Sequence, residues 1–346
     1  MNKFDLGILG GGQLGMFICQ AAKKLNFSTI VLSQANDFSA KQFCNHYLIG
    51  NYNDKNILND FINLADNFTI ETENIPKEVL KKIEKNKNLF PSSKIVEISQ
   101  NRLKEKKFLN SLKGIRTARY KPLINFIDLK KSLEFFGNTA ILKSCEFGYD
   151  GKGQHTVQQS NLENFKKLNF KNYILEETLD FNKEISVIVC RTKNNCSYYP
   201  PVENLHKNSI LRETTFPAKI EKKTRDNAIK IALEISSKLN LIGILAIEMF
   251  IMKDDSILIN ELAPRPHNSG HWSIDFCKYS QYQNLLFSIF NKKVKDPEPI
   301  GSCKMVNIIG NDYKNKEKIE KIFKFYDYYK EEIKPLRKMG HYTKIT

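Results

Sequence analysis

Two apolar segments that flank a short polar stretch constrain the fold more than any other feature of this chain. Residues 243–252 (GILAIEMFIM) and 257–260 (ILIN) have the aliphatic and β-branched composition of buried strands. Residues 253–256 (KDDS) between them have the composition of a turn. We interpret the two segments as the strands of a buried β-hairpin.

This hairpin would bring two carboxylates together. If its turn is centred between Asp254 and Asp255, Glu248 faces Glu261 at a Cβ separation of about 5 Å. Carboxylates so placed need a cation or a shared proton, and magnesium is usually held by carboxylates and substrate phosphates. A longer turn, or a glutamate that points to solvent, would separate them, and Asp-Asp lacks the glycine favoured in tight hairpins. The same register pairs Met252 with Ile257 and Phe250 with Ile259.

The second strand runs into a polar loop, residues 264–272, directly after Glu261. Pro264 and Pro266 break the strand. An apolar strand that leads into a polar loop is a common way for a scaffold to present chemical groups. The polar side chains of this loop are Arg265, His267, Asn268, Ser269 and His271.

A glycine turn lies near the N-terminus. A strand over residues 5–9 is followed by residues 10–15 (GGGQLG) and an apolar helix over residues 16–25. This G-x-G-x-x-G pattern directs backbone N–H groups and a helix N-terminus at a phosphate. The second strand, residues 28–32, is followed by Ser-Gln instead of the acid that binds the NAD ribose, which disfavours NAD. Alternatively, the glycines serve only close packing of the helix on the strand.

Strands and helices alternate up to about residue 98, which predicts a small parallel-sheet domain. A strand over residues 67–70 ends in Glu71 and Glu73. Ligands of open α/β folds bind at the carboxyl edge of the sheet, where these acids would lie. They could instead favour the N-terminus of the helix that Pro76 starts.

A second glycine-rich loop follows a helical segment over residues 93–113, which contains Arg102 and a basic run, KEKK, interpreted as a solvated helix face. A strand over residues 139–142 leads to Lys143 and the loop, residues 147–154 (FGYDGKGQ). Such a loop can cover phosphates, with Lys143 as a point charge. It lacks the Gly-Lys-Ser/Thr end of a P-loop, and a plain hairpin turn is the alternative.

The remaining segments extend a sheet and end in a basic tail. A strand over residues 173–176 continues into EETL, whose backbone can meet a purine edge, and Glu184 can bind ribose hydroxyls. The other expected elements are a strand over residues 202–206, a helix over 225–239, a helix over 281–290, a strand over 305–309, an aromatic helix over 319–325 and the basic motif RKMGH at 337–341.

Length and charge bound the class of protein. The 346 residues allow two or three domains, and 41% hydrophobic with 27% charged residues is ordinary for a globular protein. No apolar run approaches the ~18 residues that span a bilayer, and the N-terminus enters a strand at once, so we expect a cytoplasmic protein without a membrane partner. The net charge of +16 comes mainly from dispersed lysines, so nucleic acid is not an expected partner.

The chain has seven cysteines that are scattered along the sequence, which predicts reduced thiols instead of disulfides.

Four motifs, GGGQLG, GYDGKGQ, NELAPRPHNSGHW and RKMGH, resemble in sequence and order those of 5-(carboxyamino)imidazole ribonucleotide synthases, the ATP-grasp carboxylases of purine synthesis. The third motif is very specific, the second moderately so and the first only weakly. The resemblance covers essentially the whole chain and implies an α/β protein (α+β overall) with an ATP-grasp fold. The implied domains are a Rossmann-like (pre-ATP-grasp) parallel-sheet domain over residues 1–98, an ATP-grasp domain over 99–291 with a mobile lid at about 115–175, and a small C-terminal domain over 292–346, shortened relative to the family.

The resemblance also implies the reaction. ATP and bicarbonate give carboxyphosphate and ADP, and carboxyphosphate, or the carbon dioxide it releases, carboxylates the exocyclic amine of 5-aminoimidazole ribonucleotide. Magnesium would be held by Glu248 and Glu261, with manganese as the alternative ion, and the enzyme would be a homodimer. The implied ATP-binding residues are Arg102, Lys143, Gly148, Tyr149, Asp150, Gly151, Lys152, Gly153, Gln154, Glu176, Glu177, Thr178, Leu179, Glu184, His206, Asn260 and Glu261.

The ribonucleotide would lie on the first helix. Glu73, with Glu71 as the alternative, would meet its ribose or amine. Arg265 and Lys338 would stabilise the anionic intermediate, His267 would transfer a proton at the amine and Tyr149 would close over the site. The implied substrate-binding residues are Gly12, Gln13, Leu14, Glu73, Arg265, His267, Asn268, Ser269, Arg337 and Lys338.

The chain departs from the family pattern at two places, and three other functions are alternatives to the one that the resemblance implies. Lys152 stands where the family has arginine, which exchanges a bidentate fork for a point charge. The chain ends six residues after Gly340, where relatives continue, so the expected dimer is less secure. The alternatives are another ATP-grasp ligase with a different acceptor, an RNA-binding module without turnover, and an NAD oxidoreductase.

Overall fold

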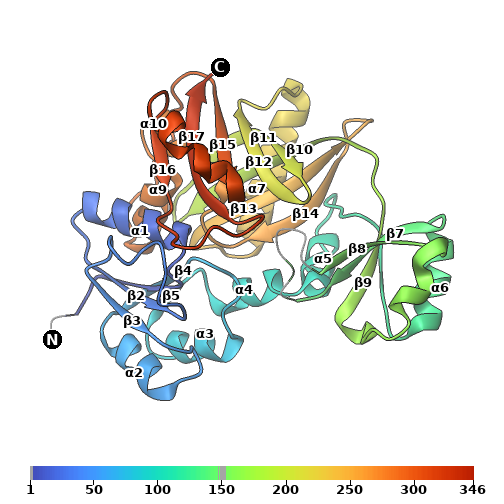
Figure 1. Ribbon diagram of the computed structural model, residues 1–346, viewed down its shortest axis with the longest axis horizontal. Coiled ribbons are helices and arrows are strands. Elements are labelled where there is room, and N and C mark those ends of the chain that lie inside the picture. Colours follow the sequence, from blue (N-terminus) through green and yellow to red (C-terminus); the bar gives the residue numbers. More distant parts are fainter. Residues whose placement is uncertain (1–2, 147, 149–152) are drawn as a thin grey trace.

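A computed structural model gives the fold for residues 3–146, 148 and 153–346. Figure 1 shows the lid (green) standing away from the N-terminal elements (blue), with the C-terminal strands (red) above helix α1. Within the described residues, no helix has the length and hydrophobicity needed to cross a membrane. All seven cysteines are free thiols.

The N-terminal sheet is parallel, with strand order β3-β2-β1-β4-β5. Its central strands β1 and β2 are fully buried, as continuous apolar runs in a parallel sheet should be. The alternation of strands and helices predicted from the sequence is therefore confirmed. The elements are β1 (Leu6–Leu9), α1 (Gln13–Lys24), β2 (Thr29–Ser33), β3 (His46–Ile49), α2 (Lys55–Asn63), β4 (Asn67–Ile70), α3 (Lys77–Glu84), β5 (Asn88–Phe90) and α4 (Ser93–Ser99).

An eight-stranded antiparallel sheet forms the body of the molecule, with order β14-β13-β10-β11-β12-β15-β17-β16. Strands from the C-terminal segment extend the same sheet as the central hairpin. The elements are α5 (Arg102–Asn110), β10 (Phe181–Arg191), β11 (Cys196–Lys207), β12 (Ile210–Phe216), α7 (Lys222–Lys238), β13 (Gly243–Met252), β14 (Ile257–Ala263), α8 (Ser273–Phe276), α9 (Gln281–Ile289), β15 (Cys303–Ile309), α10 (Lys316–Glu320), β16 (Phe325–Asp327) and β17 (Lys338–Ile345), with 3-10 turns η3 (Asn268–Gly270) and η4 (Gly310–Asn315).

The lid is a four-stranded antiparallel sheet of order β6-β9-β7-β8 with a core of its own. Its core residues all lie between Leu123 and Leu175. The lid elements are β6 (Tyr120–Pro122), α6 (Phe126–Phe135), β7 (Thr139–Ser144), β8 (Gln154–Gln158), η1 (Gln159–Phe165), η2 (Phe170–Asn172) and β9 (Tyr173–Glu177).

Two helix predictions need correction. The segment over residues 93–113 is not one helix, because Asn101 caps a second helix by accepting hydrogen bonds from the N–H groups of Leu103 and Lys104. The aromatic segment over residues 319–325 is mostly not helical: α10 ends at Glu320, and Phe325 begins strand β16. Its aromatic residues pack on β17, where Phe323 stacks on Tyr342.

The predicted hairpin exists, but its register near the turn is wrong by one residue. Ile251 pairs with Ile257 and Phe250 with Leu258, because the turn has three loop residues and Asp255 takes a left-handed conformation (φ +61°). A β-bulge between Ile259 and Glu261 then restores the predicted pairing of Glu248 with Glu261. The extra residue in that bulge is Asn260.

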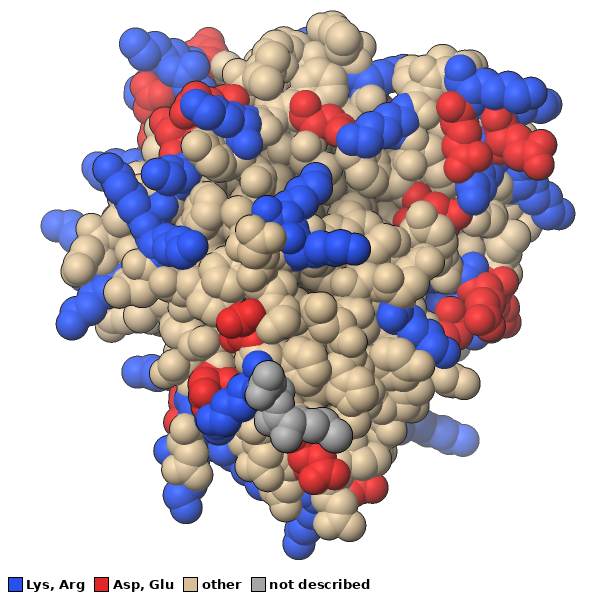
Figure 2. All heavy atoms as spheres, turned by 90° about the vertical axis from the view of Figure 1, so that its left-hand side faces the viewer, with Lys and Arg blue, Asp and Glu red and all other residues tan. Residues whose placement is uncertain are grey.

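Basic residues are distributed over the surface that Figure 2 shows. Lys and Arg side chains form small groups near the centre and on the left of this view, and Asp and Glu side chains lie elsewhere on the same face. The positive charge of that face is therefore divided among several groups.

Candidate active site

A cleft of about 740 Å³ collects residues from the N-terminal sheet, the lid, the large sheet and the C-terminal segment. It lies at the carboxyl end of β4, where the sequence predicts ligands of a parallel sheet to bind. The structure therefore brings together residues that are far apart in the chain. The sequence-predicted site residues in its lining are Gln13, Leu14, Glu73, Arg102, Lys143, Gln154, Glu184, His206, Glu248, Asn260, Glu261, Arg265, His267, Asn268, Arg337 and Lys338.

Other predicted site residues lie outside this lining. Glu177 pairs with Arg119, and the Thr178 hydroxyl donates to the carbonyl of Thr139 in the lid. Gly148 accepts a hydrogen bond from Arg102 through its carbonyl. The predicted residues outside the lining are Gly12, Gly148, Gly153, Glu176, Glu177, Thr178, Leu179 and Ser269. Tyr149, Asp150, Gly151 and Lys152 lie outside the described residues.

Glu248 and Glu261 form the carboxylate pair that the sequence predicts. Burial and the charge of Glu261 raise the pKa of Glu248 to about 7. The Asn260 amide donates to Glu248 Oε2 (3.4 Å), and Arg102 Nη1 lies 3.4 Å from Glu261 Oε2. The two carboxylates therefore repel each other, and a bound cation would relieve this repulsion.

The residues around this pair fit a magnesium ion that is bound partly by carboxylates and partly by phosphate oxygens of a substrate. Within the described part of the chain, no cluster of three or more His, Cys, Asp or Glu side chains could hold a metal alone. Magnesium is commonly bound by one or two carboxylates and completes its shell with waters and substrate phosphates. Glu248 and Glu261 supply that number of carboxylates.

A buried Lys–Glu–Lys group lies beside the cleft. Lys143 Nζ is 2.9 Å from Glu176 Oε2, and Lys106 Nζ is 3.2 Å from Glu176 Oε1. Glu105 and Lys106 are only 1% and 2% exposed, so the prediction of a solvated face for the KEKK run is wrong at these two positions. The reason is that α5 packs on β14, where the Glu105 carboxylate accepts the backbone N–H of Leu262 (2.7 Å).

An ion pair joins the polar loop to the N-terminal sheet. Arg265 binds both carboxylate oxygens of Glu73, with Nη2 at 3.0 Å from Oε1. Burial alone would raise the pKa of Glu73, but the Arg265 guanidinium outweighs burial and lowers it. Glu73 therefore lines the cleft as an ionised carboxylate that is paired with Arg265.

Glu71 occupies the N-terminus of α1, where the sequence predicts a phosphate. The Gly15 N–H donates to Glu71 Oε2 (3.3 Å). A Cβ atom at Gly12 would lie 2.8 Å from both Glu71 oxygens, so only glycine permits this approach. Basic residues of the C-terminal segment line the same cleft and can offset this carboxylate: Lys330, Lys334, Arg337 and Lys338.

The polar loop places His267 and Asn268 in the cleft. His267 Nε2 lies 3.2 Å from Glu248 Oε1, and Asn268 Oδ1 is buried without a hydrogen-bond partner among the described residues. Burial and the nearby charges of Arg265 and Lys338 lower the pKa of His267 well below its usual range. The other predicted histidine, His206, pairs with Glu184.

Sequence reasoning missed several residues of the site. Lys330 and Lys334 line the cleft, and their spacing before Arg337 was the available signal. Phe250 also lines the cleft, although its position in an apolar strand gave no sign of that. Lys106 could not be recognised, because it lies in a charged run whose other lysines, Lys104 and Lys107, are exposed.

Family comparisons cover nearly the whole chain. The sequence model of the ribonucleotide synthetase preATP-grasp domain matches residues 1–100, and that of the ATP-grasp domain matches residues 108–282. The phosphoribosylaminoimidazole carboxylase C-terminal domain matches residues 303–346. The N5-carboxyaminoimidazole ribonucleotide synthase of Bacillus subtilis is 36% identical over 344 residues, which are 98% of this chain and 90% of that protein.

Solved structures agree with the sequence comparisons. N5-carboxyaminoimidazole synthetase from Staphylococcus aureus, complexed with ADP, has a TM-score of 0.93 at 32% identity and covers 100% of this chain and 94% of its own. The Aspergillus clavatus enzyme in complex with ADP and 5-aminoimidazole ribonucleotide has a TM-score of 0.90 at 29% identity, with the same coverage. The chain therefore belongs to the N5-carboxyaminoimidazole ribonucleotide synthase family, the ATP-grasp carbon–nitrogen ligases of purine biosynthesis.

Proposed function

We propose that the cleft couples ATP cleavage to the carboxylation of 5-aminoimidazole ribonucleotide by bicarbonate, with its residues divided into three groups. Bicarbonate oxygen attacks the γ-phosphorus of ATP, which gives carboxyphosphate and ADP. The exocyclic amine nitrogen then bonds to the carboxyl carbon, the bond from that carbon to the phosphate oxygen breaks, and the amine loses a proton. The observation that carries the proposal is the single cleft that joins the Glu248–Glu261 pair to Arg265 and the N-terminus of α1.

The first group would bind ATP. Arg102 and Lys143 line the cleft and supply positive charge for the phosphates, while the Glu184–His206 pair would face the ribose. Glu248 and Glu261 would hold magnesium, which supplies neutralisation of phosphate charge when it is bound. The segment over residues 176–179 would meet the adenine, and the residues Gly148 to Gln154 would cover the phosphates.

The second group would bind the ribonucleotide. Gln13 and Leu14 on α1 would receive its phosphate together with Lys330, Arg337 and Lys338, which line the cleft beside Glu71. Positive charge on the C-terminal segment supports this assignment, since it can compensate both Glu71 and a phosphate.

The third group would surround the reacting carboxyl group. Arg265 presents a planar fork that suits a carboxylate or carboxyphosphate, and the same guanidinium binds Glu73. His267 and Asn268 lie next to it, and Asn268 Oδ1, which has no partner within the described part of the chain, could accept a substrate N–H or O–H group. Most of the catalysis would come from positioning and charge neutralisation.

The proposal keeps three expectations from the sequence. These are domain boundaries near residues 98 and 291, a homodimer and a cytoplasmic location. The family resemblance supports the domain boundaries and the homodimer, and light scattering of the purified chain would test the homodimer.

ADP release by the purified chain tests the proposed function. With Mg-ATP present, we expect strong stimulation that requires both bicarbonate and 5-aminoimidazole ribonucleotide. Glu261→Gln should lower this rate by at least about 100-fold, because a lost metal contact costs several kcal/mol of transition-state stabilisation. Its melting temperature should stay within a few degrees of the wild type. A folded, ATP-binding chain that is not stimulated by the ribonucleotide would be an ATP-grasp ligase with another acceptor.

A further inference from the structure

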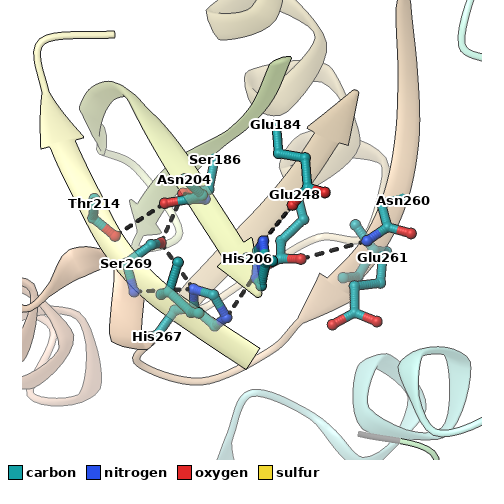
Figure 3. A network of polar contacts seen from close by, with 12 residues as sticks. Glu184, Ser186, Asn204, His206, Thr214, Glu248, Asn260, Glu261, His267 and Ser269 are labelled. Carbon is teal, nitrogen blue, oxygen red and sulfur yellow. Dashed lines mark hydrogen bonds and ion pairs between the residues drawn. The ribbon is translucent and has the colours of Figure 1, made fainter. Parts of the chain in front are cut away.

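A chain of buried polar side chains leads from the interior of the large sheet to the cleft (Figure 3). It begins at Thr214 on β12, passes through Asn204 on β11 and Ser186 on β10, and ends at Ser269 and His267 in the polar loop. The consecutive distances are 3.0 Å (Thr214 Oγ1 to Asn204 Oδ1), 3.0 Å (Asn204 Nδ2 to Ser186 Oγ), 2.7 Å (Ser186 Oγ to Ser269 Oγ) and 2.8 Å (Ser269 Oγ to His267 Nδ1). All five residues are less than 9% exposed.

The orientation of the Asn204 amide gives the first two hydrogen bonds their direction. An amide oxygen only accepts, so Thr214 donates to Asn204 Oδ1, and an amide nitrogen only donates, so Ser186 accepts from Asn204 Nδ2. The hydroxyl hydrogen of Ser186 is then available to Ser269 Oγ, and the hydroxyl hydrogen of Ser269 is available to His267 Nδ1.

A backbone group supports the same direction independently. The Ser269 N–H lies 3.3 Å from His267 Nδ1, in the 3-10 turn η3 that His267 caps. A backbone N–H can only donate, so Nδ1 is an acceptor and carries no hydrogen. With no hydrogen on Nδ1, the ring is the neutral tautomer whose hydrogen lies on Nε2.

The Nε2–H group faces negative charge in the cleft. It lies 3.2 Å from Glu248 Oε1, while the Asn260 amide donates to the other oxygen of the same carboxylate. The opposite tautomer would direct a ring N–H at the Ser269 N–H, and this contact would be repulsive whatever the protonation state of Glu248.

We propose that Ser269, Ser186, Asn204 and Thr214 are positioning residues that hold His267 with its hydrogen on Nε2, and that His267 serves as a hydrogen-bond donor to an oxygen of the transferred carboxyl group. The inference rests on the proposed function for the identity of that group. In this tautomer Nε2 has no lone pair to take a proton, and Nδ1 is covered by Ser269. The donor role therefore replaces the proton transfer at the amine that the resemblance implies for His267. A donor fixed in advance toward developing negative charge needs no reorganisation during the reaction.

Nitrogen NMR of the full chain labelled with 15N-histidine tests the tautomer directly. The chain has six histidines, and the His267 signals are those missing in His267→Gln. We expect a protonated-type shift for Nε2 and an unprotonated-type shift for Nδ1. A hydrogen on Nδ1, or on both nitrogens, at neutral pH overturns the assignment. This measurement needs no turnover, so its outcome is separate from the ADP-release test of the proposed function.

Two substitutions at His267 distinguish a role as hydrogen-bond donor from a role as proton acceptor. A glutamine amide can donate but cannot take a proton, whereas leucine can do neither. For a donor role, His267→Gln should turn over at least about 10-fold faster than His267→Leu, in the range found for one preorganised donor. Equal loss in the two variants, with ATP binding intact in both, contradicts the proposal.

The far end of the chain offers a test with a matched control. Thr214→Val keeps the shape of the side chain but removes the hydroxyl that orients Asn204, and should lower kcat several-fold while leaving the KM for ATP unchanged. Thr215→Val makes the same change at the next residue of β12, whose side chain points to the other face, and should leave kcat unchanged. Ser186→Ala breaks the chain at a second place and should resemble Thr214→Val. Equal kcat in all three variants and the wild type would refute the positioning role.

Discussion

At the scale of single residues, buried charge prepares the site before any ligand binds. Burial would raise the pKa of Glu176, but Lys143 and Lys106 outweigh it and lower it to about 2. The carboxylate is therefore ionised and keeps Lys143 at the wall of the cleft. A phosphate that binds Lys143 would leave Lys106 to balance Glu176, so the buried lysine preserves neutrality.

Buried acids should make the stability of the ligand-free protein depend on pH. Folding raises the pKa of Glu248 from 4.5 to about 7 and that of Glu105 from 4.5 to about 8, in both cases mainly by burial. The folded state then binds more protons than the unfolded state between these values. Stability conferred by the protonated forms is complete below about pH 4.5 and is lost as pH rises through 7 to 8.

We therefore expect Glu248 and Glu105 to lower the free energy of unfolding, measured in urea, by roughly 1 kcal/mol or more between pH 5 and pH 8. His267, His271 and His341, whose pKa values are lowered mainly by burial, contribute in the opposite direction as pH rises toward about 6.5. Glu248→Gln should flatten part of this slope, because glutamine does not titrate. Glu78→Gln, at an exposed position of α3, is the control and should keep the wild-type slope. An identical slope in Glu248→Gln and the wild type would show that Glu248 does not titrate in this range.

At the scale of elements, the β13–β14 hairpin combines an irregular turn with an irregular strand. The three-residue turn shifts the register by one residue, and the bulge at Asn260 shifts it back. Side chains alternate between the faces of a sheet, so without the bulge Glu261 would lose its place opposite Glu248. The bulge therefore aligns the carboxylate pair and directs Asn260 into the same cleft.

The turn itself should respond to substitution at Asp255, whose φ of +61° suits glycine better than any branched residue. We expect Asp255→Val to destabilise the chain by about 1–2 kcal/mol and Asp255→Gly to be neutral or stabilising by less than 1 kcal/mol. Urea titrations would measure both. The ADP-release rate should be unchanged, and equal stability of the two variants would argue against the left-handed turn.

At the scale of the whole molecule, one core unites the N-terminal helix, the large sheet and the C-terminal strands, while the lid has a separate core. Phe17 on α1 is 2% exposed and packs against aromatic rings from three other parts of the chain. Its ring partners are His271, Tyr282, Tyr326, Tyr328 and His341. We infer that the body unfolds as one unit and that the lid can open separately.

Large-to-small substitutions in the two cores should show that the body and the lid unfold independently. Phe17→Ala should lower the free energy of unfolding of the body by about 3–5 kcal/mol. Leu133→Ala, at a fully buried lid position, should increase hydrogen exchange in residues 115–175 and leave exchange in α1 and α9 unchanged. Faster exchange throughout the molecule in Leu133→Ala would mean that the lid is not an independent unit.

The sequence by itself determined the order of the elements and most of the chemistry. Apolar runs gave β1, β13 and β14, and the glycine turn gave the start of α1, because these signals depend on near neighbours in the chain. The facing of Glu248 and Glu261 was predicted correctly, although the turn and the bulge that produce it were not. The turn and the bulge shift the register in opposite directions, and the local pattern of apolar residues cannot reveal two shifts that cancel.

Only the tertiary structure decided which charges meet. Arg265 and Glu73 are 192 residues apart in the chain, and Lys106 is buried only because α5 lies against β14 and the lid supplies Glu176. The chain of hydrogen bonds that sets the His267 tautomer crosses three strands and a loop. Burial and partnership of a polar group depend on what packs opposite it, and a single sequence carries no local record of that.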